Sequence, residues 1–346
     1  VGARPLDIKQ FFYNENPSKL WEDLKEFMKT INYSLLIKQH PWILHKNQNC
    51  ILSPDADGLL CGLFMSKYLD WIIKGFYDSK VLLKEEGVDT KKCIFLDMEI
   101  FRKEIRSVGQ HLLLFNKNNH PEDWDNFENC ISPNNIRNYD FKNNFQLKYP
   151  LGTIHILLSI ISQKHKVRFK KDIIPILLYV DGTFKNLFNY PENCLSWLKY
   201  LKADLSDSSL KEIFFSRHYS ISEMMAELAS LFDELRELNN GKRGGDKIKI
   251  SDRDSKIINF DVKKGIFNLV VKDKAEKLLN LFGKKTGWNY NSKKWTWGDL
   301  EYFVFEKGII SPSQRRYDKL ISDNPVSFAI TSNLTLEYTI DKKGIF

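Results

Sequence analysis

Two aspartates in the first third of the chain have the type and spacing of metal ligands. Asp55 and Asp57 are separated by a single residue, and Gly58 follows them. Two carboxylates placed in this way can point at one position, while the glycine lets the backbone approach a ligand closely. Their hard oxygen atoms suit Mg²⁺ or Mn²⁺, and an added imidazole favours Mn²⁺. A surface turn without function has the same composition, because aspartate and glycine are common turn residues.

Two further aspartates follow apolar segments. Asp97 closes the apolar run at 92–98, which predicts a buried strand, and Asp181 follows the apolar segment 173–180, which predicts a helix start that gives way to a strand or turn. Residues 50–53 predict another buried strand, and the apolar periodicity of 59–69 predicts a helix directly after it. Strands that alternate with helices indicate an α/β fold with a parallel sheet, and such sheets bind ligands at the carboxyl ends of their strands. We therefore expect the aspartates to meet at that edge.

The order of these segments resembles the DHH phosphoesterase superfamily, which includes the RecJ-like exonucleases. The segment Ile51–Cys61 is similar to the first motif of that family, Ile94–Met98 resembles the second motif, and Leu178–Thr183 resembles the fourth. The resemblance covers residues 48 to 200 and implies a parallel-sheet, DHH-like N-terminal domain.

The third motif, Asp-His-His in the family, is altered in this chain. Its counterpart is Ser107–His111, in which Gly109 replaces the aspartate and Gln110 replaces the first histidine, so that His111 alone is retained. The following segment, which contains His155, resembles the helix that comes after this motif in relatives. Gln110 and His155 are therefore candidate substitutes for the lost ligand. The alternative for His111 is a structural histidine that caps a helix before Leu112.

The resemblance implies a metal-dependent phosphodiesterase or exonuclease that acts on nucleic acid or short oligonucleotides through metal-activated water. The implied catalytic and metal-binding residues are Asp55, Asp57, Asp97, His111 and Asp181, with Mn²⁺ or Mg²⁺ as the cofactor. A hydrolase of pyrophosphate or cyclic dinucleotides is one alternative. Because the third motif is altered, an inactive DHH-like scaffold that binds nucleic acid or protein partners is another.

The chain of 346 residues exceeds the usual size of a single domain. Asparagine and glycine cluster at 239–246, which predicts a linker. It separates a DHH-like domain at 1–238, which begins with a helical extension, from a smaller α+β domain at 247–346 that supplies substrate contacts. In this second domain we expect strands at 247–251, 266–271, 302–305, 328–331 and 334–338, and a helix at 275–282.

Lysines and aromatic residues alternate between 284 and 297, a mixture that could neutralise phosphates and stack bases. The candidates for substrate binding are Lys284, Lys285, Lys293, Lys294, Trp295 and Trp297. A strand pair that buries its aromatic side chains has the same pattern. The net charge of +8 favours a nucleic-acid or nucleotide partner.

The cysteines and the hydropathy of the chain predict a cytoplasmic location and no membrane partner. The five cysteines are widely spaced and form no CxxC pair, so we expect neither a disulfide framework nor a zinc site. No apolar run approaches the roughly 18 residues that a membrane span needs, and the first residues lack a signal-peptide pattern.

Overall fold

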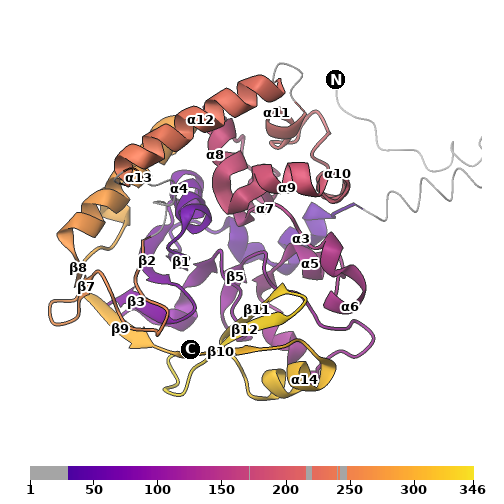
Figure 1. The fold of residues 1–346 in the computed structure, drawn as a ribbon, viewed down its shortest axis with the longest axis vertical. Helices are drawn as coiled ribbons and strands as arrows, with labels where there is room; N and C mark the ends of the chain where they lie inside the picture. Colours follow the sequence, from indigo (N-terminus) through magenta and orange to yellow (C-terminus); the bar gives the residue numbers. More distant parts are fainter. Residues whose placement is uncertain (1–29, 171, 216–219, 240, 242–247) are drawn as a thin grey trace, which may run out of the picture.

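A mostly parallel sheet lies at the centre of this mixed α/β fold (Figure 1). The computed structural model describes residues 30–170, 172–215, 220–239, 241 and 248–346. The predicted helical extension up to residue 29 and most of the predicted linker lie outside the described residues. Among the described residues, seven strands form the central sheet, in the order β6 (Cys130–Ile131), β5 (Arg106–Val108), β4 (Ile94–Leu96), β1 (Asn49–Leu52), β2 (Ile72–Tyr77), β3 (Val81–Glu85) and β9 (Leu300–Val304).

The chain changes direction across the sheet at β1. From β1 it crosses to β2 on one side, and it later returns to β4 on the other side, both parallel to β1. The strands β5 and β6 continue the parallel arrangement, whereas β3 runs antiparallel to both β2 and β9. A reversal of strand order of this kind opens a crevice at the carboxyl ends of the parallel strands.

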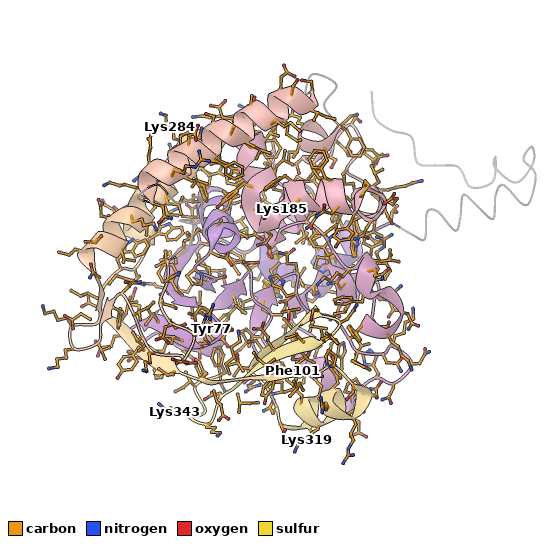
Figure 2. The ribbon with its side chains drawn as sticks, in the orientation of Figure 1. Tyr77, Phe101, Lys185, Lys284, Lys319 and Lys343 are labelled. Atoms are coloured by element: carbon orange, nitrogen blue, oxygen red, sulfur yellow. The ribbon has the colours of Figure 1, made fainter. Side chains whose placement is uncertain are left out.

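The apolar strands are buried on both faces, which explains why they are continuously hydrophobic. Cys50 and Leu52 contribute to one core cluster, and Ile51 between them contributes to the core on the opposite face. In Figure 2, Tyr77 lies inside the molecule, whereas Lys284 lies at its rim. The predicted strands before Asp55 and before Asp97 are thus confirmed as β1 and β4.

Helices pack on one face of the sheet, and Figure 1 shows α12 and α13 along the rim beside α4 and α8. The helix predicted at 59–69 is confirmed as α4, which begins directly after the aspartate turn. The helices of the described residues are α3 (Tyr33–Gln39), α4 (Ala56–Leu69), α5 (Pro133–Ile136), α6 (Phe141–Asn144), α7 (Thr153–Ile161), α8 (Ile173–Tyr179), α9 (Thr183–Asn189), α10 (Pro191–Tyr200), α11 (Lys211–Phe214), α12 (Ile221–Leu238), α13 (Leu269–Thr286) and α14 (Gln314–Ser322).

The C-terminal part of the chain contributes to the central sheet and to its cores. Its strand β9 pairs with β3, Trp295 packs in the core with α4, and Val326 packs on the other face of the sheet. The strands β10 (Glu306–Ile310), β12 (Thr335–Ile340) and β11 (Ser327–Ser332) form a second, antiparallel sheet, and β7 (Phe260–Asp261) pairs with β8 (Ile266–Phe267). On either side of the predicted linker, the chain therefore shares one sheet and one core.

One strand prediction in this part was wrong, and another was right only in its first two residues. The segment 248–251 forms only an isolated bridge between Ser251 and Ile257. In the expected strand at 266–271, β8 ends at Phe267 and helix α13 begins at Leu269, because the Asn268 side chain accepts a hydrogen bond from the Val270 N–H and caps the helix. Leu269 is 76% exposed, so the alternation that suggested a strand has no sheet to face.

Candidate metal centre

The carboxyl ends of three neighbouring parallel strands carry the predicted acidic and histidine residues. Asp55 follows β1, Asp97 follows β4, and the loop from Gly109 to His111 follows β5. Asp97 has a left-handed backbone conformation, with φ of 60°, and its N–H donates to the Val108 carbonyl oxygen at 2.8 Å. A non-glycine residue in this conformation is uncommon and is concentrated at functional sites.

Asp55 is the N-cap of α4. Its Oδ1 accepts a hydrogen bond from the Gly58 N–H at 3.1 Å, and its Oδ2 accepts one from the Ser53 hydroxyl at 2.9 Å. A Cβ atom on Gly58 would lie 2.1 Å from the Ser53 carbonyl oxygen, so the turn accepts only glycine at this position. The aspartate-glycine pattern thus has a structural role as a cap, and it also fixes Asp55 at the strand end.

Asp57 is buried at the N-terminus of helix α7. Its Oδ2 accepts a hydrogen bond from the Thr153 N–H at 2.5 Å, and its Oδ1 accepts one from the Ile154 N–H at 3.1 Å. Burial raises the pKa of the Asp57 carboxyl, and the charges of Asp181 and Asp55 raise it further, while the two backbone hydrogen bonds lower it. The positive end of the α7 dipole therefore holds this carboxylate in place.

Thr153 joins Asp57 to Asp97. Its hydroxyl donates to Asp97 Oδ1 at 2.6 Å, while its N–H donates to Asp57. Asp97 is also buried, and burial followed by the charges of Asp55, Asp57 and Asp181 raises its pKa. Carboxylates that raise one another's pKa are close together, and a bound divalent cation would relieve their repulsion.

Asp97, His111 and Asp181 meet most closely. One ligand atom from each of the three side chains lies within 4.8 Å of the other two. Asp97 is buried, whereas His111 and Asp181 are exposed and accessible to a ligand. The structure thus gathers two carboxylates and an imidazole in one place, and it brings Asp55 and Asp57 within electrostatic reach of Asp97.

Asp181 reaches this site from the end of a helix. Helix α8 ends at Tyr179, a short 3-10 turn follows, and Asp181 has a left-handed φ of 49° before Gly182 at 65°. The uniformly apolar segment before it left open whether a strand or turn follows the helix start, because period 2 and period 3.6 cannot be told apart in such a run. Consecutive left-handed residues end the helix and turn the chain into α9.

The two candidate substitute ligands have different positions. Gln110 lines a cavity of about 360 Å³ together with His111, Asp181 and Lys148. His155 lies fully buried in α7, where its Nδ1 accepts a hydrogen bond from the Gly152 N–H at 3.1 Å and its ring packs near Phe214. Gln110 is therefore the candidate that shares a cavity with the cluster.

Burial of His155 predicts an acid-sensitive fold. Burial lowers the pKa of His155 to about 4 from 6.5, so between these pH values the unfolded chain binds the proton and the folded chain does not. Stability is therefore present above pH 6.5 and is lost as the pH falls toward 4, by roughly 3 kcal/mol. We expect His155→Gln to remove this slope, and denaturant titrations of both proteins at several pH values measure it. The same dependence of the free energy of unfolding on pH in both proteins would contradict the prediction.

Three cavities meet at His111, which lines each of them. The largest, of about 540 Å³, contains Asp55 and Asp97, together with Lys80, Lys249, Arg253 and Lys307. Lys80 and Lys307 are held by protein groups, since Lys80 donates to the Asp252 carbonyl oxygen and Lys307 pairs with Glu337. Lys249 and Arg253 are exposed on the cavity wall. The sequence did not indicate these two cations, because the alternation at 247–251 predicts a strand of a separate second domain and not the wall of a cavity beside the acids.

The lysine-aromatic cluster contributes mainly to the core. Trp295 and Trp297 are 4% and 6% exposed, and their rings stack on each other with centroids 6.3 Å apart. Lys285 pairs with Glu234 and Lys294 pairs with Asp70, whereas Lys284 and Lys293 are exposed. None of the residues predicted here for substrate binding lines the three cavities at His111.

In comparisons with known proteins, no family model, curated protein or solved structure matches this chain. In the part of the chain that the structure describes, the helices are too short or too polar to cross a bilayer.

Proposed function

We propose that this protein is a metal-dependent phosphodiesterase that acts on nucleic acid or short oligonucleotides. The observation that supports it best is the cluster of Asp97, His111 and Asp181, whose ligand atoms lie within 4.8 Å of one another. Asp97 and His111 line the cavity of about 540 Å³, and Asp181 lines the neighbouring cavity of about 360 Å³ with His111. Asp55 and Asp57 adjoin this cluster and raise the pKa of Asp97. The centre lies at the carboxyl edge of a parallel sheet, the usual ligand site of such folds.

The residues of the centre fit a divalent cation with mixed oxygen and nitrogen ligands. Asp97, Asp181 and His111 would hold Mn²⁺, with Asp55 and Asp57 as further carboxylate ligands, and the imidazole favours Mn²⁺ over Mg²⁺. The raised pKa values of Asp57 and Asp97 fit a site that needs a cation to ionise fully. When bound, the metal supplies a water of lowered pKa and polarises a phosphoryl oxygen.

Several groups of the protein position the metal ligands and the substrate phosphate. Thr153 and the N-terminus of α7 hold Asp57 and Asp97 in fixed orientations before a substrate arrives. His111 is exposed where the cavities join, so it can contact the scissile phosphate as well as a metal. Lys249 and Arg253 line the same cavity as Asp55, and their charges attract phosphate groups toward the acids.

The direct test measures hydrolysis of a short 5′-labelled oligonucleotide with Mn²⁺ and with excess EDTA. We expect cleavage only with the metal. Activity on pyrophosphate or a cyclic dinucleotide without activity on oligonucleotides would show that the substrate is one of these smaller compounds and not an oligonucleotide. Binding of Mn²⁺ without hydrolysis of any of these compounds would favour the inactive scaffold that the altered residues Gly109 and Gln110 suggest.

All five cysteines are free and buried, which supports our proposal of a reducing compartment such as the cytoplasm.

The cavity cations lead to a prediction about substrate affinity. We expect Lys249→Ala with Arg253→Ala to raise KM for an oligonucleotide about 10-fold or more and to leave kcat nearly unchanged, because the two cations line the cavity and would bind phosphate groups without belonging to the metal cluster. The dependence of the logarithm of affinity on the logarithm of salt concentration should become shallower by about 1 per lost contact. Lys293→Ala is the matched control, since Lys293 is exposed and lies outside this cavity. An equal effect of the control would locate substrate binding in the lysine-aromatic cluster instead.

A further inference from the structure

Residue 109 lies beside the metal centre without a side chain of its own. Gly109 follows β5 and precedes Gln110 and His111, and its N–H donates to the Ile131 carbonyl oxygen at 3.1 Å. A Cβ atom on Gly109 would lie 2.5 Å from Cδ and 2.7 Å from Oε2 of Glu99. The carboxyl group of Glu99 therefore occupies the space that any side chain at position 109 would need.

Glu99 is attached to the loop that carries His111. Its side chain is only 3% exposed, and its Oε1 accepts a hydrogen bond from the Leu112 N–H at 2.8 Å. The charge of His111 also acts on this carboxyl group, so the two side chains are near each other. A buried carboxylate is tolerated only where polar partners satisfy it, and here the Leu112 N–H, next to His111, is such a partner.

The opposite side of the same loop is held by Asn134. Its Nδ2 donates to the carbonyl oxygens of Gln110 at 3.1 Å and Leu112 at 3.0 Å, and its Oδ1 accepts from the Tyr149 N–H. The Asn134 bonds join neutral groups, whereas Glu99 contacts the loop with a carboxyl group. Glu99 also lines a cavity of about 200 Å³ together with His111 and Lys307.

We propose that Glu99 is a positioning residue, whose carboxyl group fills the space beside Gly109, holds the loop at Leu112 and thereby keeps His111 against Asp97 and Asp181. The inference rests on the metal centre of the proposed function. Outer carboxylates that orient a metal-binding histidine typically change metal affinity 10- to 100-fold when they are removed. Asp97 and Glu99 both lie in the segment that follows β4, so the same part of the chain carries both carboxyl groups.

A side chain at residue 109 and the carboxyl group of Glu99 cannot occupy the same space. Variants at these two positions, with Mn²⁺ itself as the probe, therefore test the role of Glu99. Isothermal titration gives the Mn²⁺ affinity, and thermal unfolding in EDTA reports folding separately. We expect Glu99→Gln and Glu99→Ala to weaken Mn²⁺ binding about 10-fold or more. Gly109→Asp alone should lower Tm, because its Cβ would meet the Glu99 carboxyl group. Glu104→Gln is the charge-matched control, since Glu104 is exposed and pairs with Lys91.

The double variant carries the decisive result. In Glu99→Ala with Gly109→Asp, the new aspartate has the vacated space and can return a carboxylate to it, so Mn²⁺ affinity should recover about 10-fold relative to Glu99→Ala. Glu99→Ala with Gly109→Ala fills part of the space without a charge and should show no recovery. The inference is overturned if the Glu99 variants bind Mn²⁺ as the wild type does, or if both double variants behave alike. Because Glu99→Gln keeps an acceptor for the Leu112 N–H, it remains informative even where Glu99→Ala does not fold.

Hydrolysis measured on the same proteins separates this inference from the proposed function. If the wild type binds Mn²⁺ without cleaving an oligonucleotide, and Glu99→Gln weakens the binding, the phosphodiesterase proposal fails and the role of Glu99 stands. If the wild type cleaves the oligonucleotide and the Glu99 variants keep full Mn²⁺ affinity, the role of Glu99 fails and the proposed function stands. A wild type that binds no Mn²⁺ overturns both.

Discussion

Replacement of Asp97 by asparagine should reduce Mn²⁺-dependent hydrolysis on the order of 10³-fold, about 4 kcal/mol of lost transition-state stabilisation. Asp97 contributes to the closest group of ligand atoms and is the buried member of that group. The asparagine oxygen can still accept the hydrogen bond from the Thr153 hydroxyl, so the substitution removes a charge and leaves the geometry nearly intact. Initial rates at saturating Mn²⁺ and the metal affinity from titration measure the effect.

The same variant should be more stable than the wild type when both are free of metal. The pKa of Asp97 is raised in the folded chain, so its contribution to stability is present below the pKa of the unfolded chain and is lost as the pH rises through the folded value. Asparagine has no such loss, and the Tm difference in EDTA should therefore grow from acidic to neutral pH. Asp123→Asn, on an exposed residue, is the control. A variant less stable than the wild type at neutral pH would assign Asp97 a structural role.

The part of the fold that could be predicted from the sequence is the part with unambiguous boundaries. Residues 50–52 form a short apolar run that ends at Pro54 and the aspartate turn, and the structure has strand β1, the Asp55 cap and helix α4 there. The run before Asp97 has the same form and is strand β4. Because both strands are parallel neighbours, the position of their acids at one edge follows from topology alone.

The groups that hold the acids could not be predicted, because they depend on tertiary contacts. Thr153 reaches Asp97 across 56 residues with its hydroxyl and donates its N–H to Asp57, yet in the sequence it is an ordinary helix start. The role of Glu99 becomes visible only in the structure, where its carboxyl group fills the space that a side chain at residue 109 would need. Lys249 and Arg253 reach the cavity on an irregular segment, although the alternation at 247–251 predicts a strand there.

The aromatic residues between 288 and 297 form a pattern that is visible in the sequence but fits two interpretations. Their alternation with lysine is compatible with base stacking and with a core, and only burial separates the two interpretations. Trp288 and Trp295 are 1% and 4% exposed, and the Trp295 ring lies where a Cβ on Gly62 of α4 would meet it at 2.9 Å. The pattern therefore records the packing of the C-terminal segment on α4.

Substitution of Gly152 by alanine should damage the metal centre through a single methyl group. Gly152 has φ of −73° and ψ of 161°, a conformation that alanine adopts without strain. Its Cβ would, however, lie 2.9 Å from Oδ2 and 3.1 Å from Cγ of Asp57. That carboxylate cannot simply move away, because the N–H groups of Thr153 and Ile154 hold both of its oxygens. We expect a loss of about 1–3 kcal/mol in the free energy of unfolding and at least a 10-fold loss of Mn²⁺ affinity.

A double-mutant cycle identifies the contact that is responsible. In an Asp57→Ala background the methyl group of Gly152→Ala has space, so its cost in the free energy of unfolding should fall to within about 0.5 kcal/mol of zero. Gly298→Ala serves as the control for glycine replacement, because its Cβ would lie at an ordinary 3.4 Å from Ile266. Additive effects of the two substitutions would mean that Gly152 is needed for another reason, such as the start of α7. Strong coupling would show that the absence of a side chain at residue 152 is what allows helix α7 to bind Asp57.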